Sequence, residues 1–171
     1  MLPAYAEIFL LVAACVILLL DLYVDKWRGD LTYVLSLLAL AGTGVCTVMV
    51  SAATGGQVAY TFNSMFVSDQ MAVALKIATY ISVAVCFVYS RGYLLARGLY
   101  RSEFFTLTLF GMLGMMVMIS ANHFLTLYLG LELLSLCLYS LVALNRDSAL
   151  STEAAMKYFV LGALASGMLL Y

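Results

Sequence analysis

Long apolar runs alternate with short polar breaks along the whole chain. Most runs are about 20 residues long, which is the length a helix needs to cross the hydrocarbon core of a bilayer. The breaks carry many of the charged residues, the Gly-Gly pair and the Asn residues that favour turns. The pattern predicts an all-α, polytopic transmembrane bundle with six spans, over residues 3–24, 31–53, 69–89, 103–121, 123–144 and 152–171.

The breaks differ in length and character. The break at 25–30 contains Trp27, which suits an anchor at headgroup level, and residues 54–68 are expected to form a loop. Residues 91–102 form a basic loop, whereas the break at 122–123 is only long enough for a tight turn. The fourth and fifth spans should therefore form an antiparallel hairpin. Ser151 or Thr152 can cap the sixth span.

Basic residues fall on one side of this topology. Successive breaks lie on alternate sides of the membrane, and the N-terminus is taken to lie on the first side. Every basic residue of the loops then lies on the second side: Lys26, Arg28, Arg91, Arg97, Arg101 and Arg146. The positive-inside rule makes that side cytoplasmic and places the N-terminus outside.

One carboxylate lies in the middle of the fifth apolar run. The run 123–144 spans roughly 33 Å as a helix, and Glu132 is near its centre. A charge at that depth costs about 3 kcal/mol or more, so such residues usually face a bundle interior or a wet cavity. Tyr128, Ser135 and Tyr139 share its helix face by their spacing. This polar face is typical of a proton path.

Lys157 lies inside the sixth span, and two interpretations of it are open. It can form a helix-surface ion pair with Glu153 at i−4 and snorkel to the interface. Alternatively, the small residues that follow, with Gly162 and Ser166 at i,i+4, allow close helix packing that would turn Lys157 into the bundle. The small-residue surface favours the second interpretation.

The remaining polar residues receive simpler interpretations. Lys76, downstream of Asp69, is expected to form a structural ion pair between helices. His123 is expected to be an interfacial residue, which ranks above a role in proton uptake. Glu7 and Asp21 lie toward the two ends of the first span, where interfacial solvation explains them.

Composition narrows the function classes. Apolar residues make up 65% of the chain and charged residues 10%, with a net charge of −1, so neither a soluble domain nor a nucleic-acid-binding protein is expected. The four Cys residues lie in four different apolar runs, which favours buried small hydrophobes over a disulfide or metal site. The sequence contains no Walker loop, dinucleotide fingerprint or haem-attachment motif, so no cofactor is expected in this chain.

Two motifs carry a resemblance to a known family. The segment 122–139, with Gly130-Leu-Glu132-Leu-Leu-Ser-Leu, and the element Ala-Ala-Met-Lys157-Tyr are similar to the antiporter-like membrane subunits of respiratory complex I. The resemblance extends to Phe66-Val-Ser-Asp69 with Lys76 downstream. It implies that residues 1–102 form three N-terminal transmembrane helices and that residues 103–171 begin an inverted-repeat antiporter-like fold. A chain that stops at an apolar Tyr171 would then be the N-terminal fragment of a longer protein.

The resemblance also implies roles. Glu132 would be the fifth-helix carboxylate that pairs with a Lys on a broken seventh helix, which is absent here, and Lys157 would be a sixth-helix Lys near it. Tyr128, Ser135 and Tyr139 would support proton translocation, with Lys76, Asp69 and His123 as secondary candidates. Cys137 replaces a Pro of many relatives, which puts a bend of the fifth helix in doubt.

The expected function follows from this resemblance. It implies a proton-translocating, non-redox subunit of an NADH–quinone oxidoreductase in the bacterial inner membrane. NADH, FMN, iron–sulfur clusters and quinone would bind partner subunits, and the partners in the membrane would include adjacent antiporter-like subunits. A sodium/proton antiporter subunit and a structural membrane scaffold are the alternatives.

Overall fold

The computed structural model describes residues 2–23, 28–55 and 57–171. A short 3-10 turn at Leu2–Ala4 leads into six helices long and apolar enough to span a membrane, which confirms the predicted bundle. These are α1 (Tyr5–Tyr23), α2 (Arg28–Ala53), α3 (Gln70–Ala96), α4 (Ser102–Ile119), α5 (Phe124–Val142) and α6 (Ala149–Leu170). The predicted anchor Trp27 and the basic residue Lys26 lie outside the described residues.

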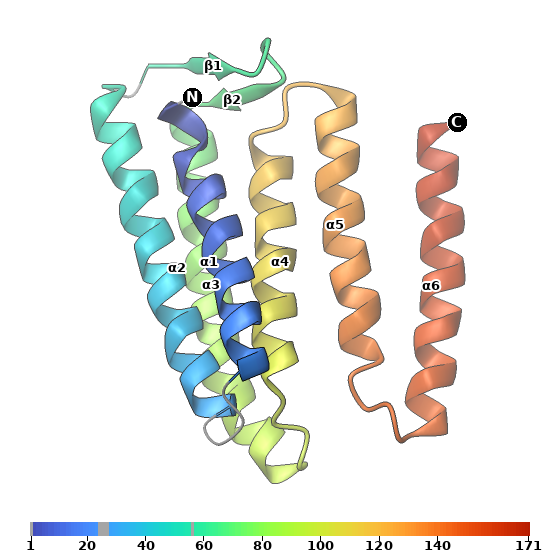
Figure 1. The fold of residues 1–171 in the computed structure, drawn as a ribbon. Coiled ribbons are helices and arrows are strands. Elements are labelled where there is room, and N and C mark those ends of the chain that lie inside the picture. The colour runs from blue at the N-terminus through green and yellow to red at the C-terminus, as the bar shows by residue number, and fades with distance from the viewer. Residues whose placement is uncertain (1, 24–27, 56) are drawn as a thin grey trace.

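The helices form a compact group with an extension on one side. Helices α1 to α4 pack around one another, α5 packs on α4, and α6 packs on α5 (Figure 1). Among the described residues, α6 has no other substantial helix contact. One long face of α6 is therefore left without a protein neighbour.

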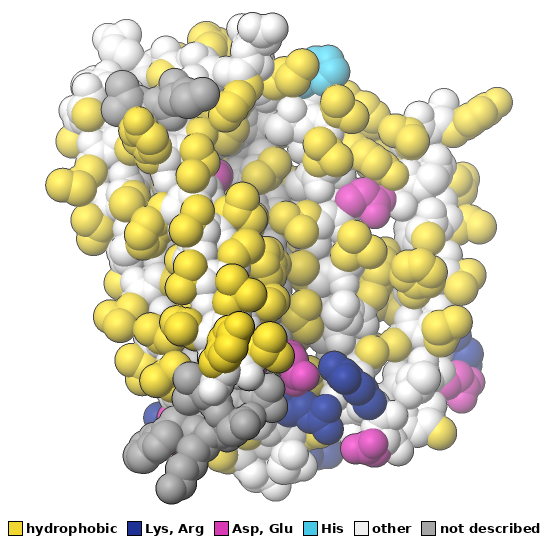
Figure 2. All heavy atoms as spheres, viewed as in Figure 1, with side chains coloured by type: hydrophobic (Ala, Val, Ile, Leu, Met, Phe, Trp, Pro, Cys, Tyr) yellow, Lys and Arg dark blue, Asp and Glu magenta, His cyan; other side chains and the backbone are white. Residues whose placement is uncertain are grey.

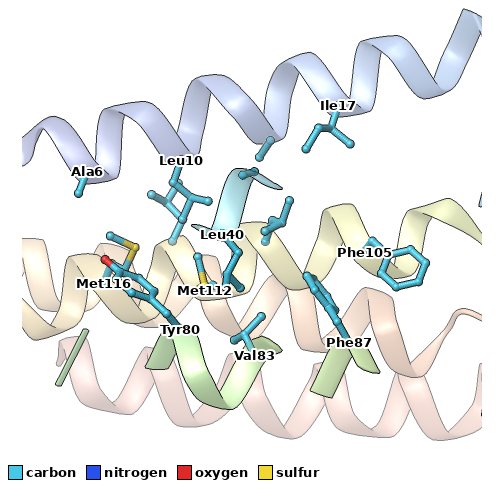
Figure 3. Close-up of a cluster of buried hydrophobic side chains, with 14 residues drawn as sticks. Ala6, Leu10, Ile17, Leu40, Tyr80, Val83, Phe87, Phe105, Met112 and Met116 are labelled. Atoms are coloured by element: carbon cyan, nitrogen blue, oxygen red, sulfur yellow. The ribbon is translucent and has the colours of Figure 1, made fainter. Parts of the chain in front are cut away.

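The hydrophobic core lies among the four helices α1, α2, α3 and α4. Phe105 and Met112 of α4 are fully buried, together with Leu10 of α1 and Phe87 of α3 (Figure 3). Phe105 makes edge-to-face ring contacts, including one of 5.4 Å between centroids with Phe87, a geometry that aromatic pairs prefer. This core contains side chains from both sides of residue 102, so packing is continuous across that position. The predicted division into residues 1–102 and 103–171 stays a prediction.

Helix α3 is longer than predicted. It continues to Ala96 rather than ending at Tyr89, so Arg91 belongs to the helix and not to a loop. The polar turn stays helical because Arg91 finds partners there: its guanidinium pairs with Asp30 of α2 at 3.0 Å and lies over the ring of Tyr33. Gly98, with φ of +65°, ends the helix in the left-handed conformation that glycine adopts readily.

The segment predicted as a loop at 54–68 contains a β-hairpin. Strands β1 (Ala59–Thr61) and β2 (Phe66–Ser68) pair antiparallel, with Tyr60 opposite Val67. The hairpin lies across the end of the bundle that holds the α4–α5 turn (Figure 1), where the Val67 amide donates to the Ser120 carbonyl at 2.9 Å. Strands of three residues are too short for an alternating pattern to reveal them.

Side chains cap three of the helices. Asp69 accepts a hydrogen bond from the Ala72 amide at 2.6 Å at the start of α3, and His123 Nδ1 accepts one from the Leu125 amide at 3.2 Å at the start of α5. The prediction that Ser151 or Thr152 caps the sixth span is wrong. Ser148 is the cap and accepts from the Ser151 amide at 3.4 Å, because α6 begins earlier, at Ala149.

The basic loop residues gather at the other end of the bundle (Figure 2). Arg101 lies 3.7 Å from Asp147, and Arg146 lies 3.5 Å from Glu103. The Tyr100 hydroxyl, in the loop before α4, donates to Asp30 at 3.1 Å. Burial, followed by the hydrogen bond and the charge of Asp30, raises the pKa of Tyr100 to about 12. By the positive-inside rule this is the cytoplasmic end.

Candidate functional site

Two glycines bring the backbones of α4 and α5 together. A Cβ atom on Gly130 would lie 2.8 Å from the carbonyl oxygen of Gly114, and one on Gly114 would lie 2.7 Å from the carbonyl oxygen of Gly130. Small residues allow such close approach of helices in lipid. Cys137, about two turns further along α5, is buried against the same neighbour, as predicted for a small hydrophobe. By contrast Cys15 and Cys86 are exposed on the outside of the bundle, so the prediction of burial is wrong for them.

This contact determines the direction of Glu132. Because successive residues on a helix are rotated by roughly 100°, a side chain two residues after Gly130 points away from α4. Glu132 is half-buried, and its Oε1 atom is buried without a hydrogen-bond partner among the described residues. A buried carboxylate oxygen is costly to leave unpaired. The site therefore contains an acidic group whose partner is not supplied by the described part of the chain.

The predicted polar face is turned toward α6. Tyr139, at i+7 from Glu132, makes edge-to-face contacts with Tyr158 and Phe159, with centroid distances of 4.9 and 5.5 Å. Its phenol ring occupies the space that a side chain at Gly162 would need. Tyr128 and Ser135 are half-buried, and no hydrogen bond joins either of them to Glu132 within the described residues. Glu132 shares a helix face with Tyr128, Ser135 and Tyr139, but no hydrogen bond among the described residues joins these side chains into a network.

Lys157 does not approach Glu132. Its ammonium group pairs with Glu153 at 2.6 Å, and its side chain is 70% exposed. Tyr158 contacts Tyr139, which is seven residues from Glu132, so the two charged groups are separated by roughly 10 Å along the bundle. In antiparallel helices their side chains also lean in opposite directions.

The prediction that Lys157 points into the bundle is therefore wrong for the described chain. The structure instead contains the i−4 ion pair between Lys157 and Glu153. The small residue Gly162, which favoured the inward interpretation of Lys157, instead accommodates the ring of Tyr139.

A second buried charged group was missed by the interpretation of Glu7 as a solvated interfacial acid. The Lys76 ammonium donates to Glu7 Oε1 at 2.5 Å, and both residues are buried. The expected interhelical ion pair of Lys76 is confirmed, with Glu7 of α1 as its partner. Both residues lie near the outer ends of helices that start on the same side, and this equal depth made Glu7 a candidate partner without showing that α1 and α3 face each other.

Asp21 is also more than a solvated end residue. Its carboxylate accepts hydrogen bonds from Ser102 of α4 at 2.6 Å and from Thr32 of α2 at 3.1 Å. It thus ties three helices together at the cytoplasmic end. Within the described residues, no group of three or more His, Cys, Asp or Glu side chains is placed to hold a metal ion. Asp69 and His123 act as helix caps, and their secondary roles in proton transfer stay predictions.

Known proteins similar to this chain point to one family. Residues 121–171 match the family described as NADH:quinone oxidoreductase/Mrp antiporter, TM. NADH-quinone oxidoreductase subunit N of Nitrosomonas europaea is 56% identical over 99% of this chain and 34% of the relative. The subunit of the same name from Thioalkalivibrio sulfidiphilus is 53% identical, over 99% of this chain and 35% of the relative.

The fold is similar to that of a solved complex. A chain of respiratory complex I from Thermus thermophilus with bound aureothin matches with a TM-score of 0.72 and 28% identity, over 97% of this chain and 35% of that chain. This chain thus spans about a third of the length of the relatives it matches. The bacterial relatives and the six apolar helices also confirm the prediction of a multi-pass protein of the bacterial inner membrane.

Motif, overall identity and fold agree. The predicted resemblance to the antiporter-like membrane subunits of respiratory complex I is therefore confirmed, and the chain is homologous over essentially its whole length to about a third of NADH-quinone oxidoreductase subunit N.

Proposed function

We propose that this chain forms part of a proton-translocating membrane subunit of NADH–quinone oxidoreductase. The 56% identity to a subunit of that name and the six-span bundle support the proposal. The subunit takes part in the oxidoreductase without carrying out redox chemistry. NADH, FMN, iron–sulfur clusters and quinone bind partner subunits, and the neighbours in the membrane include other antiporter-like subunits.

The observation that carries the proposal is the unpaired Oε1 atom of Glu132 in an apolar helix. An ionised carboxylate in such surroundings is stable only while a cation lies near it. When the cation is withdrawn, the carboxylate takes up a proton. When the cation returns, the proton is released. Glu132 is therefore the proton-holding group of the proposal, and Tyr128, Ser135 and Tyr139 line the face along which water would reach it.

The cation that controls Glu132 belongs, in this proposal, to a part of the subunit beyond the described residues. Lys157 is engaged by Glu153 and lies roughly two helical turns away. The resemblance implies a Lys on a broken seventh helix as the partner. Lys157 would then be a further step of the path rather than the immediate partner of Glu132.

The decisive experiment replaces Glu132 by Gln in the full-length subunit within the assembled complex. We expect NADH oxidation to continue and proton pumping per NADH to fall, because the amide cannot take up and release a proton. Ser36→Ala is the matched control, since Ser36 is fully buried in α2 and donates a hydrogen bond to the Tyr33 carbonyl of its own helix. Normal pumping by an assembled Glu132→Gln complex would refute the proposal.

A sodium/proton antiporter subunit is the second candidate, because the matched family includes Mrp antiporters. It requires sodium-dependent transport in vesicles and no co-purification with NADH- and quinone-handling subunits. A structural scaffold is the third candidate, in which Glu132 and Lys157 have static roles. Replacing both by apolar residues would then leave pumping unchanged in an assembled complex.

A further inference from the structure

The ion pair between Glu7 and Lys76 takes no part in the proposed action of Glu132. It lies on the other side of α4, between α1 and α3, near the outer end of the bundle. Glu7 is 7% exposed and Lys76 is 2% exposed. Two ionisable groups enclosed this completely require an explanation, because an apolar pair of similar volume would stabilise the bundle at least as well.

The carboxylate of Glu7 is only half satisfied. Oε1 accepts the hydrogen bond from Lys76, whereas Oε2 is buried with no partner among the described residues. A buried carboxylate oxygen without a donor is unfavourable, and a proton on that oxygen removes the charge responsible for the penalty. Oε2 is therefore the position at which Glu7 can accept a proton.

The ammonium group of Lys76 has a second stabilising contact. It lies 5.1 Å from the centroid of the Phe66 ring, in the β2 strand of the hairpin. A cation over an aromatic face is attracted by the ring quadrupole, and more strongly when it is removed from water. The Phe66 ring thus gives the Lys76 ammonium group an attractive contact in addition to that with Glu7.

We propose that Glu7 and Lys76 form a second proton-binding site, with Oε2 of Glu7 as the acceptor and the β-hairpin as its lid. In the binding step one proton from the outer aqueous side forms an O–H bond at Oε2, and Glu7 becomes a neutral carboxylic acid. Lys76 keeps its own proton, continues to donate to Oε1 and rests on the Phe66 ring. Release breaks the same O–H bond and restores the ion pair.

The surrounding elements contribute few competing groups. On α3, Tyr80 lies one turn beyond Lys76, and its hydroxyl is hydrogen-bonded to Thr47 of α2 at 2.8 Å. Asp69 is occupied as the cap of α3. On α2 the titratable group next to Tyr80 is Cys46, and the charged residue of α4, Glu103, lies at the opposite end of the bundle. Glu7 thus supplies the carboxylate of this site, and its Oε2 atom is buried without a partner among the described residues.

The hairpin is suited to controlling access. Two backbone hydrogen bonds hold it to the α4–α5 turn. The Val67 N–H donates to the Ser120 carbonyl, and the Asn122 N–H donates to the Met65 carbonyl at 3.0 Å. Its turn contains three consecutive non-glycine residues with positive φ, Phe62, Asn63 and Ser64, a conformation of elevated energy. Opening of this short, strained element would uncover the pair without unpacking a helix.

Infrared spectroscopy of the full-length protein in phospholipid vesicles tests the site, because a protonated carboxyl group absorbs separately from a carboxylate. We expect a carboxyl band that appears on acidification, is absent in Glu7→Gln and persists in Glu132→Gln. In D₂O this band should shift as the proton exchanges. Phe66→Ala should accelerate that exchange at least about tenfold, because local opening is no longer required.

Two results would overturn the proposal: a Glu7→Gln spectrum identical to wild type at every pH, or an exchange rate unaffected by Phe66→Ala. Should Glu7→Gln fail to fold by circular dichroism, Glu7→Asp keeps the acid, and the same band must then change frequency. If it does not, the proposal also fails. Because the assay uses neither NADH nor pumping, its outcome is independent of the function proposed for Glu132.

Discussion

The backbones of Gly114 and Gly130 touch, and this contact sets the rotation of the helix that carries Glu132. The carboxylate of Glu132 follows Gly130 by two residues and is therefore directed away from α4. A side chain at either glycine would separate the helices and rotate or shift the acidic group. The close packing of α4 on α5 thus determines the orientation of Glu132.

We expect Gly130→Ala to destabilise the protein by about 1–3 kcal/mol, as overpacking of a tight interface usually does. The new Cβ would lie 2.7 Å from Met118 Cγ and 2.8 Å from the Gly114 carbonyl oxygen, and the second of these atoms is backbone that cannot move alone. Denaturant unfolding in detergent measures the change. Gly92→Ala is the control, because its Cβ would have no neighbour within 4 Å. Equal stability of the two variants would contradict the argument.

The ion pair of Glu7 and Lys76 should respond differently to single and double replacement. Lys76→Met leaves a carboxylate buried without a partner, and we expect a loss of about 3–5 kcal/mol. The double variant Glu7→Leu/Lys76→Met removes both charges, so it should recover most of that loss. A double-mutant cycle on unfolding free energies checks this. Strictly additive losses would show that the two residues do not interact.

Replacement of Glu132 by Leu should stabilise the isolated chain by about 1 kcal/mol, because it removes a buried, unpaired carboxylate oxygen. Proton pumping by the assembled complex should fall in the same variant. Thermal unfolding and pumping assays are measured side by side. Lower thermal stability of Glu132→Leu would mean that the carboxylate has a stabilising partner after all.

Lys157→Met should change stability by less than about 0.5 kcal/mol, because its ion pair with Glu153 lies on an exposed helix surface. The unfolding free energy, compared with that of Lys76→Met, provides the test. A loss for Lys157→Met as large as that for Lys76→Met would place Lys157 in a buried pair.

Tyr100 should ionise near pH 12, later than an ordinary tyrosine at about 10. Because its pKa is raised in the folded protein, the stability that Tyr100 contributes is complete below pH 10 and declines as the pH rises from about 10 to about 12. Ultraviolet absorbance of tyrosinate, compared between wild type and Tyr100→Phe, measures this. Loss of a component titrating near pH 10 in the variant would contradict the prediction.

Several features of the fold were accessible from sequence because they depend on local properties. Bilayer thickness fixes the length of an apolar span, so the six helices could be predicted from their hydrophobic runs. Likewise, a break as short as 122–123 requires neighbouring helices to be antiparallel. The depth of Glu132 follows from counting residues along one helix.

The partners of the charged residues depend on the tertiary structure. Glu7 and Lys76 are separated by 69 positions in the chain, and equal depth alone does not reveal that their helices face each other. Lys157 could point inward or pair with Glu153 until the ring of Tyr139 was found against Gly162. Hydrophobicity determines that a helix crosses the membrane, but the contacts between helices determine its rotation, and the rotation decides which charges meet.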